Sequence, residues 1–190
     1  MNKLIGSMLL IVCMGCNSEK QQVVETQADS MAMLQTTEYP ITKPIHMIEF
    51  HEDPYELSLQ MARVDIDVYE LIVGMELFNG AFFVSPNAKR DFSGKFTVYL
   101  EDSNTLFPIA KLKESPPSVE EFDPHPFVNG TVNWVRSNTT YTQRLQRDSE
   151  ANFHVQGEIR FTIEPRCTFE RIPITIKYEA GELHVEVMKC

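Results

Sequence analysis

The clearest pattern in the chain is the alternation of apolar and polar residues between Gly157 and Cys190. A period of two places every second side chain on one face of a sheet, so each alternating run predicts a half-buried strand. Ala180-Gly181 lies between the last two runs and predicts a hairpin, since glycine accepts the positive φ of a tight turn. The apolar positions of the three runs are Ile159, Phe161 and Ile163, then Ile172, Ile174 and Ile176, then Leu183, Val185 and Val187.

A similar pattern fills most of residues 45–155, but residues 53–64 fit two structures. On a helix capped by Asp53, Leu57 and Val64 would share one face, whereas on a strand Leu57 would share a face with Leu59. We predict a strand here, because a β-like pattern continues through residues 66–77.

Turn signals separate the predicted strands. Asn79-Gly80 is the strongest hairpin signal, and we expect it to join residues 69–78 to residues 81–85. Residues 106–112 predict a short strand, which Pro108 places at a sheet edge or a bulge. Residues 114–130 combine prolines with acidic residues and predict a long surface loop. With about nine short strands and no convincing helix, the chain is typical of an all-β, antiparallel, immunoglobulin-like sandwich.

The amino-terminal residues differ from this pattern. Lys3 precedes an apolar run from Leu4 to Met14, which is too short to cross a bilayer core that takes about 20 residues, so the run predicts a signal peptide. It ends in Cys13-Met14-Gly15-Cys16, which resembles the lipoprotein box of bacteria, where the last cysteine is lipidated. A plain secretory signal is the alternative, although no small-x-small cleavage site precedes Cys16.

Three segments follow from these patterns. Residues 1–15 form the signal peptide, and residues 16–42 form the lipidated cysteine with a polar, flexible tether. Residues 43–190 form a single sandwich domain. We expect acyl chains on Cys16 to hold the protein on a membrane of the bacterial cell envelope, facing the periplasm or the cell surface.

Composition limits the function further. The net charge of −10 disfavours nucleic acid as a partner, and 43% hydrophobic residues suffice for one core. The carboxylates of Glu120, Glu121 and Asp123 are those of a solvated loop, and no catalytic arrangement of side chains is present. We therefore predict no metal, no cofactor and no enzymatic activity. The histidines, which we interpret as scattered on the surface, are His46, His51, His125, His154 and His184.

Short motifs between Gly80 and Cys190 resemble the amino-terminal, immunoglobulin-like periplasmic domain of the bacterial thiol:disulfide interchange protein, DsbD. They are Gly80-Ala-Phe-Phe-Val-Ser-Pro86, Glu114-Ser-Pro-Pro117, Asp123-Pro-His-Pro-Phe127 with Gly130, and a late strand that runs into Cys167. The resemblance implies a cap loop that shields a pair of redox cysteines. In this chain Pro173 stands where the second cysteine of the family would be.

Outside the amino-terminal leader the chain has two cysteines, Cys167 and Cys190, which are the candidates for any thiol chemistry. A turn at Ala180-Gly181 places Cys190 opposite Arg171, which is about 13 Å along a strand from Cys167. A disulfide needs Cα atoms within about 7 Å, so the chain would have to loop back to form one. A disulfide, an unreactive thiol and a redox-active pair all stay open.

We expect a non-catalytic binding or assembly domain that recognises an envelope protein. Its predicted contact loop spans residues 119–134, where aromatic residues lie on a segment stiffened by prolines. The candidate contact residues are Phe122, Asp123, His125, Phe127 and Trp134. Thiol–disulfide exchange or redox sensing through Cys167 and Cys190 is the alternative.

Overall fold

Side chains along most strands alternate between buried and exposed, as expected of sheets with one face against a core. The computed structural model describes residues 47–126 and 128–188, in which it has strands and no helix. The predicted all-β antiparallel sandwich is confirmed. The strands are β1 (Met47–Glu52), β2 (Tyr55–Arg63), β3 (Val68–Leu77), β4 (Phe83–Val84), β5 (Thr97–Leu100), β6 (Leu106–Pro108), β7 (Lys113–Ser115), β8 (Glu120–Asp123), β9 (Gly130–Val135), β10 (Thr139–Arg147), β11 (Phe153–Ile163), β12 (Thr168–Glu179) and β13 (Glu182–Val187).

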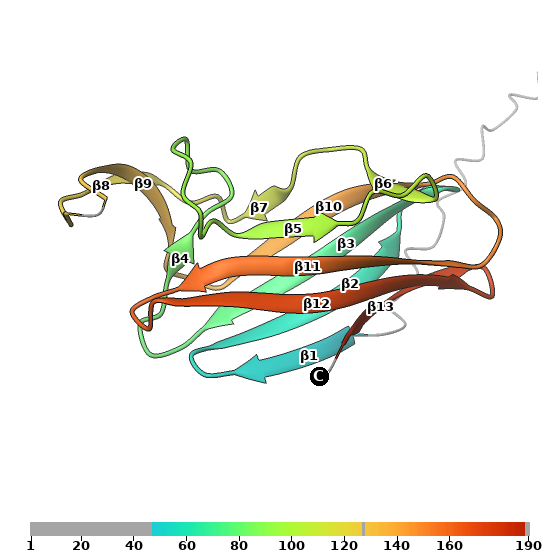
Figure 1. Ribbon diagram of the computed structural model, residues 1–190, viewed down its shortest axis with the longest axis horizontal. Helices are drawn as coiled ribbons and strands as arrows, with labels where there is room; N and C mark the ends of the chain where they lie inside the picture. The colour runs from blue at the N-terminus through green and yellow to red at the C-terminus, as the bar shows by residue number, and fades with distance from the viewer. Residues whose placement is uncertain (1–46, 127, 189–190) are drawn as a thin grey trace, which may run out of the picture. The chain divides into compact units, whose positions relative to one another are not determined.

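Two antiparallel sheets form the layers of the sandwich (Figure 1). One has the order β1-β2-β3-β10-β6, with β7 also paired to β10, and the other has the order β13-β12-β11-β5. A small third sheet, β4-β9-β8, lies at one end of the layers, where β8 and β9 curl away from them (Figure 1).

The core lies between the two large sheets and is rich in aromatic rings. Phe96 stacks on Tyr141 with ring centroids 3.9 Å apart, and Phe161 meets Tyr55 edge-on at 5.1 Å. Phe83 contacts both Phe96 and Phe161, with centroids 5.6 Å away in each case. These rings come from both layers and from the segment that connects them, so their burial holds the layers together.

The predicted carboxy-terminal hairpin is confirmed. Ala180 and Gly181 both have positive φ, at 54° and 87°, and they join β12 to β13. The ambiguous residues 53–64 are a strand, β2, which pairs with β1 and β3. Pro108 ends β6, which pairs only with β10 and lies at a sheet edge as predicted.

The predicted hairpin at Asn79-Gly80 is wrong, although the turn itself exists. Both residues have positive φ, at 54° and 71°, but β3 pairs with β2 and β10, while β4 pairs with β9. Phe83 and Val84 are buried in succession rather than alternately, because this segment leaves one layer and crosses to the small sheet. The turn therefore redirects the chain between sheets.

The prediction of a long surface loop over residues 114–130 is wrong in part, because β8 and the end of β7 lie within it. Lys113–Ser115 pairs with β10, and Glu120–Asp123 pairs with β9. The four-residue strand β8 fits between the two proline pairs, Pro116-Pro117 and the later Pro124 and Pro126. The structure has more strands than predicted, because β7 and β8, of three and four residues, lie where a loop was expected.

Several predictions concern residues outside the described part of the chain. They are the signal peptide, Cys16 with the tether, residues 43–46, Phe127 and Cys190. The described residues contain no helix with the length and apolar character that a membrane span requires.

Two glycines in strands allow a test of the packing. A methyl group added at Gly157 would lie 2.5 Å from the backbone oxygen of Tyr99 in β5, whereas one at Gly74 would meet the side-chain hydroxyl of Ser58. A hydroxyl can rotate away and a paired backbone cannot. We expect Gly157→Ala to lower the free energy of unfolding by about 1–3 kcal/mol. Gly74→Ala, the matched control, should change it by no more than about 0.5 kcal/mol. Urea unfolding measures both, and equal losses would contradict this packing.

Candidate functional site

The β8–β9 hairpin is the candidate site, because it contains most of the contact residues that the sequence predicts. It extends from the small third sheet, in which β9 is central and β8 is an edge strand (Figure 1). The register pairs Phe122 with Thr131 and Glu121 with Val132. Since side chains alternate across a strand, Phe122 lies on the face opposite to that of Val132 and Trp134.

The face that contains Val132 is packed. Val132 is buried with Val84 and Ala88 in a core cluster of its own, against which Trp134 also packs. The rings of Trp134 and Phe82 meet at 87°, with centroids 4.9 Å apart. This second cluster attaches one side of the hairpin to the end of the sandwich.

The charged side chains of the hairpin are already paired within the protein. Arg136 lies 4.3 Å above the ring of Phe82 and donates to the Oε1 atom of Glu121 at 3.0 Å. Lys89 donates to Glu120 at 2.8 Å, which lowers the pKa of that carboxyl group. Binding that relies on free charges at these positions would first have to break these pairs.

Asp123 links the two strands of the hairpin through its carboxylate. Its Oδ2 atom accepts a hydrogen bond from the indole Nε1 of Trp134 at 2.9 Å, and its Oδ1 atom accepts one from the backbone nitrogen of His125 at 2.8 Å. The backbone hydrogen bond, followed by the bond from Trp134, holds the pKa of Asp123 below its usual value. The carboxylate therefore orders both the turn and the indole ring.

The other face of the hairpin carries an exposed aromatic ring. The side chain of Phe122 is 65% exposed, and Val119, just before β8, is 80% exposed. A ribbon of two strands has no second layer that would cover both faces. Phe122 is therefore the apolar group that the hairpin presents to solvent.

A buried carboxylate holds the segment that leads into the hairpin. Glu114 of β7 accepts hydrogen bonds from the hydroxyl of Ser85 at 2.6 Å, the hydroxyl of Tyr141 at 3.2 Å and the backbone nitrogen of Ser118 at 2.6 Å. Burial raises the pKa of Tyr141, and the negative charge of Glu114 raises it further. The phenol therefore stays protonated and keeps donating to the carboxylate.

The structure brings together some of the predicted contact residues. Asp123 and Trp134 are in direct contact, Phe122 is exposed on the opposite face, and His125 lies in the turn with its backbone oxygen accepting from Val128 and Asn129. Phe127 lies outside the described residues.

Sequence reasoning missed Phe82 and Arg136, which flank Trp134. Their contact depends on the pairing of β4 with β9, for which the sequence holds no local signal.

Cys167 is separate from this hairpin in the fold. It lies in the turn between β11 and β12, has a positive φ of 52°, and is an exposed, free thiol. Its predicted partner, Cys190, is outside the described residues, so the pairing stays a prediction.

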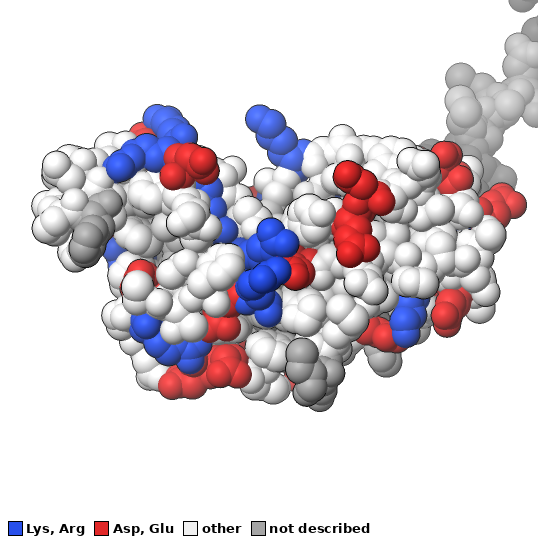
Figure 2. Space-filling model, in the orientation of Figure 1, with Lys and Arg blue, Asp and Glu red and all other residues white. Residues whose placement is uncertain are grey.

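Acidic and basic side chains are interspersed over the face in view in Figure 2. Several of the described ionic side chains are paired, and Glu158 accepts hydrogen bonds from Arg160 at 2.6 Å and from Arg171 at 2.9 Å.

Comparisons with known proteins give distant likenesses. Neither a protein-family model nor a curated protein matches the chain. The amino-terminal domain of DsbD from Neisseria meningitidis, in the reduced form, is 10% identical, with a TM-score of 0.40 over 69% of this chain and 89% of that one. The GAE domain of GGA2p from Saccharomyces cerevisiae is 10% identical, with a TM-score of 0.37 over 76% and 98%. The yeast GGA1 GAE domain-P21 structure is 7% identical, with a TM-score of 0.36 over 76% and 98%. These likenesses concern the fold alone.

Acid titration tests the contact between Asp123 and Trp134. Because the pKa of Asp123 is lowered, its carboxylate stabilises the hairpin above the usual value of 3.8 and loses this effect only as the pH falls through the lowered pKa. We expect the fluorescence of Trp134, the single tryptophan, to stay constant from pH 7 to about 4 and to change below that. Asp123→Asn should remove the transition, while circular dichroism confirms that the sheets remain. A transition above the usual pKa, or one that persists in Asp123→Asn, would contradict the contact.

Proposed function

We propose that this protein is a non-catalytic binding module that docks a protein of the bacterial envelope on the exposed face of its β8–β9 hairpin. The observation that carries the proposal is the exposed ring of Phe122 on a hairpin whose other face is packed. A large aromatic side chain held in one place contributes contact area at a small cost in conformational entropy.

The contacts beneath the hairpin support a preorganised surface. Trp134 packs against Phe82 and donates to Asp123, so the two strands are linked by side chains as well as by their ladder. The carboxylate of Glu114 fixes the backbone of Ser118, two residues before β8 begins. A partner would therefore meet a hairpin that is ordered before binding.

The lipoprotein box supports the part of the proposal that places the partner in the bacterial envelope. Acyl chains on Cys16 would hold the domain at a membrane, and residues 17–42 would act as the tether. Confinement to a membrane surface raises the effective concentration of the module near a partner in the same membrane, so a small contact face suffices.

Exchange of thiols and disulfides is the second candidate, because Cys167 is exposed and free. A single thiol cannot hold and pass on a disulfide by itself, so this function requires Cys190. The binding module is favoured because the exposed ring of Phe122 lies on a hairpin whose other face is packed.

Site-specific crosslinking tests the docking face. With a photo-reactive amino acid at position 122, we expect a discrete crosslinked species in intact cells, which mass spectrometry then identifies. Ile66, which is 58% exposed in the turn between β2 and β3, is the matched control position and should give no such species. Phe122→Ala should reduce co-purification of the identified partner at least about tenfold, as for a central aromatic contact. Equal crosslinking at both positions would exclude this face.

Replacing the predicted lipidation site tests the anchor. We expect Cys16→Ser to abolish incorporation of a palmitate analogue and to move the protein from the detergent phase to the aqueous phase in Triton X-114 partition. Cys13→Ser is the control and should leave both properties unchanged. Detergent-phase partition of Cys16→Ser would show that the membrane association has another cause.

A further inference from the structure

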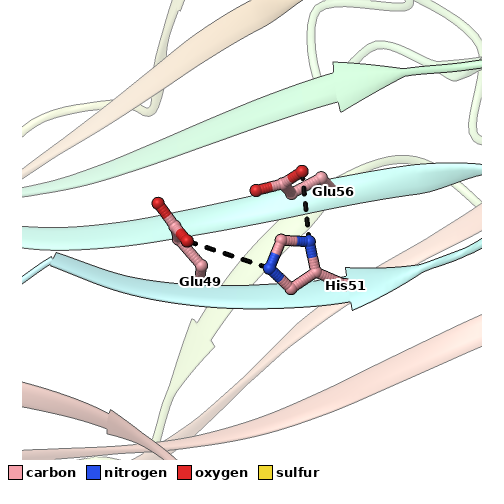
Figure 3. A group of neighbouring side chains, drawn as sticks. All are labelled: Glu49, His51 and Glu56. Atoms are coloured by element: carbon pink, nitrogen blue, oxygen red, sulfur yellow. Dashed lines mark ion pairs between the residues drawn. The ribbon is translucent and has the colours of Figure 1, made fainter.

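The β1–β2 hairpin brings three side chains with metal-binding atoms together on one face (Figure 3). His51 pairs directly with Glu56 across the two strands, and Glu49 lies two residues before His51 on the same face of β1. One candidate ligand atom from each residue lies within 4.8 Å of the others. Five positions separate His51 from Glu56 in the sequence, so only the register of the hairpin makes them neighbours.

The two nitrogens of His51 have different surroundings. Nδ1 lies 3.1 Å from Oε2 of Glu56, which is a hydrogen-bond distance, whereas Nε2 lies 3.8 Å from Oε2 of Glu49, which is too long for one. Two ligands bound to one ion at about 2.0–2.2 Å in tetrahedral geometry are roughly 3.3–3.6 Å apart. The spacing between Nε2 and Glu49 is therefore close to that of two ligands of a single cation.

The ion pair between Nδ1 of His51 and Glu56 complements this spacing. A carboxylate that accepts from Nδ1–H fixes the ring and leaves the lone pair on Nε2, which is how metal-binding histidines are commonly oriented. Figure 3 shows the imidazole of His51 between the two carboxylates, with Nδ1 toward Glu56 and Nε2 toward Glu49.

The surrounding charge is negative. Glu76 of β3 pairs with Glu56 in the ladder, which adds a third carboxylate to this part of the sheet. Among the described residues, the ion pairs of Glu49 and Glu56 are with His51, and neither is with a lysine or an arginine. A pocket of about 330 Å³, lined in part by His51, Glu56 and Tyr55, adjoins the group and has room for water molecules.

We propose that this group is a surface site for a divalent transition metal such as Zn²⁺. Nε2 of His51 and the carboxylate of Glu49 bind the ion, Glu56 orients the imidazole, and water completes the coordination. Imidazole with carboxylate suits Zn²⁺, whereas Ca²⁺ and Mg²⁺ prefer oxygen ligands alone. The site is independent of the docking hairpin, so either proposal can fail without the other.

Calorimetric titration with Zn²⁺ tests the site on the full chain with Cys13, Cys16, Cys167 and Cys190 all replaced by serine, because free thiols also bind this ion. We expect one equivalent to bind, and His51→Ala and Glu49→Gln each to weaken this binding at least about tenfold. Glu56→Gln should weaken it by about 10- to 100-fold, as for other groups that orient a ligand. His51 is exposed, so its replacement leaves the core intact.

His184 provides the matched control. Its Nε2 lies 4.0 Å from Oε2 of Glu182 on β13, which resembles the spacing of His51 and Glu49 on β1. We expect His184→Ala to bind Zn²⁺ as the parent chain does, and NMR shifts caused by Zn²⁺ to centre on the ring of His51. Equal binding by the parent chain and His51→Ala, or shifts centred away from β1 and β2, would overturn the proposal.

Discussion

The buried carboxylate of Glu114 imposes the constraint on which the arrangement of the site depends. Its residue is only 6% exposed, and an ionised group removed from water costs several kcal/mol unless hydrogen bonds replace its hydration. The donors come from the residue after β4, from β10, and from the backbone of Ser118. Since all three donors bond to the carboxylate of Glu114, they fix the position of β7 and of the residues that lead into β8.

Two kinds of contact hold the molecule together, apolar packing between the large sheets and polar contacts at the hairpin. The large sheets are held by rings that contact one another across the layers, so their geometry follows from apolar burial. The β8–β9 hairpin rests on a small cluster of buried residues, and polar contacts such as those of Glu114 and Asp123 add to it. Polar contacts are directional, and they give a short hairpin a defined orientation that a small apolar cluster would not.

Local features of the fold could be predicted from the sequence, and pairings between distant segments could not. The strands β11 to β13 follow from a period of two, and the turn at Ala180-Gly181 follows from backbone freedom, because both signals lie within a few residues. Asn79-Gly80 predicts the turn correctly but not the pairing of the strands on either side of it. The positive φ of these residues reverses the chain locally and does not determine which strand β4 pairs with. β8 was missed because the prolines around it dominate the composition of its segment.

The candidate sites show the same division. The sequence identifies Phe122 and Trp134 as aromatic residues in an unusual segment, but it does not show that one is exposed while the other packs on Phe82. The neighbours of His51 were missed entirely, because residues 53–64 fit a helix as well as a strand. Only the β1–β2 register brings Glu56 opposite His51.

The edge position of β8 has a consequence for how copies of this protein meet one another at high concentration. An open strand edge invites pairing with a strand of another molecule, which leads to aggregation. β8 is four residues long, three of them are acidic, and prolines without a backbone donor bracket it. Two copies joined antiparallel about Glu121 would place like charges opposite each other. The ring of Phe122 can thus stay exposed while the strand that carries it resists edge-to-edge pairing between copies of the protein.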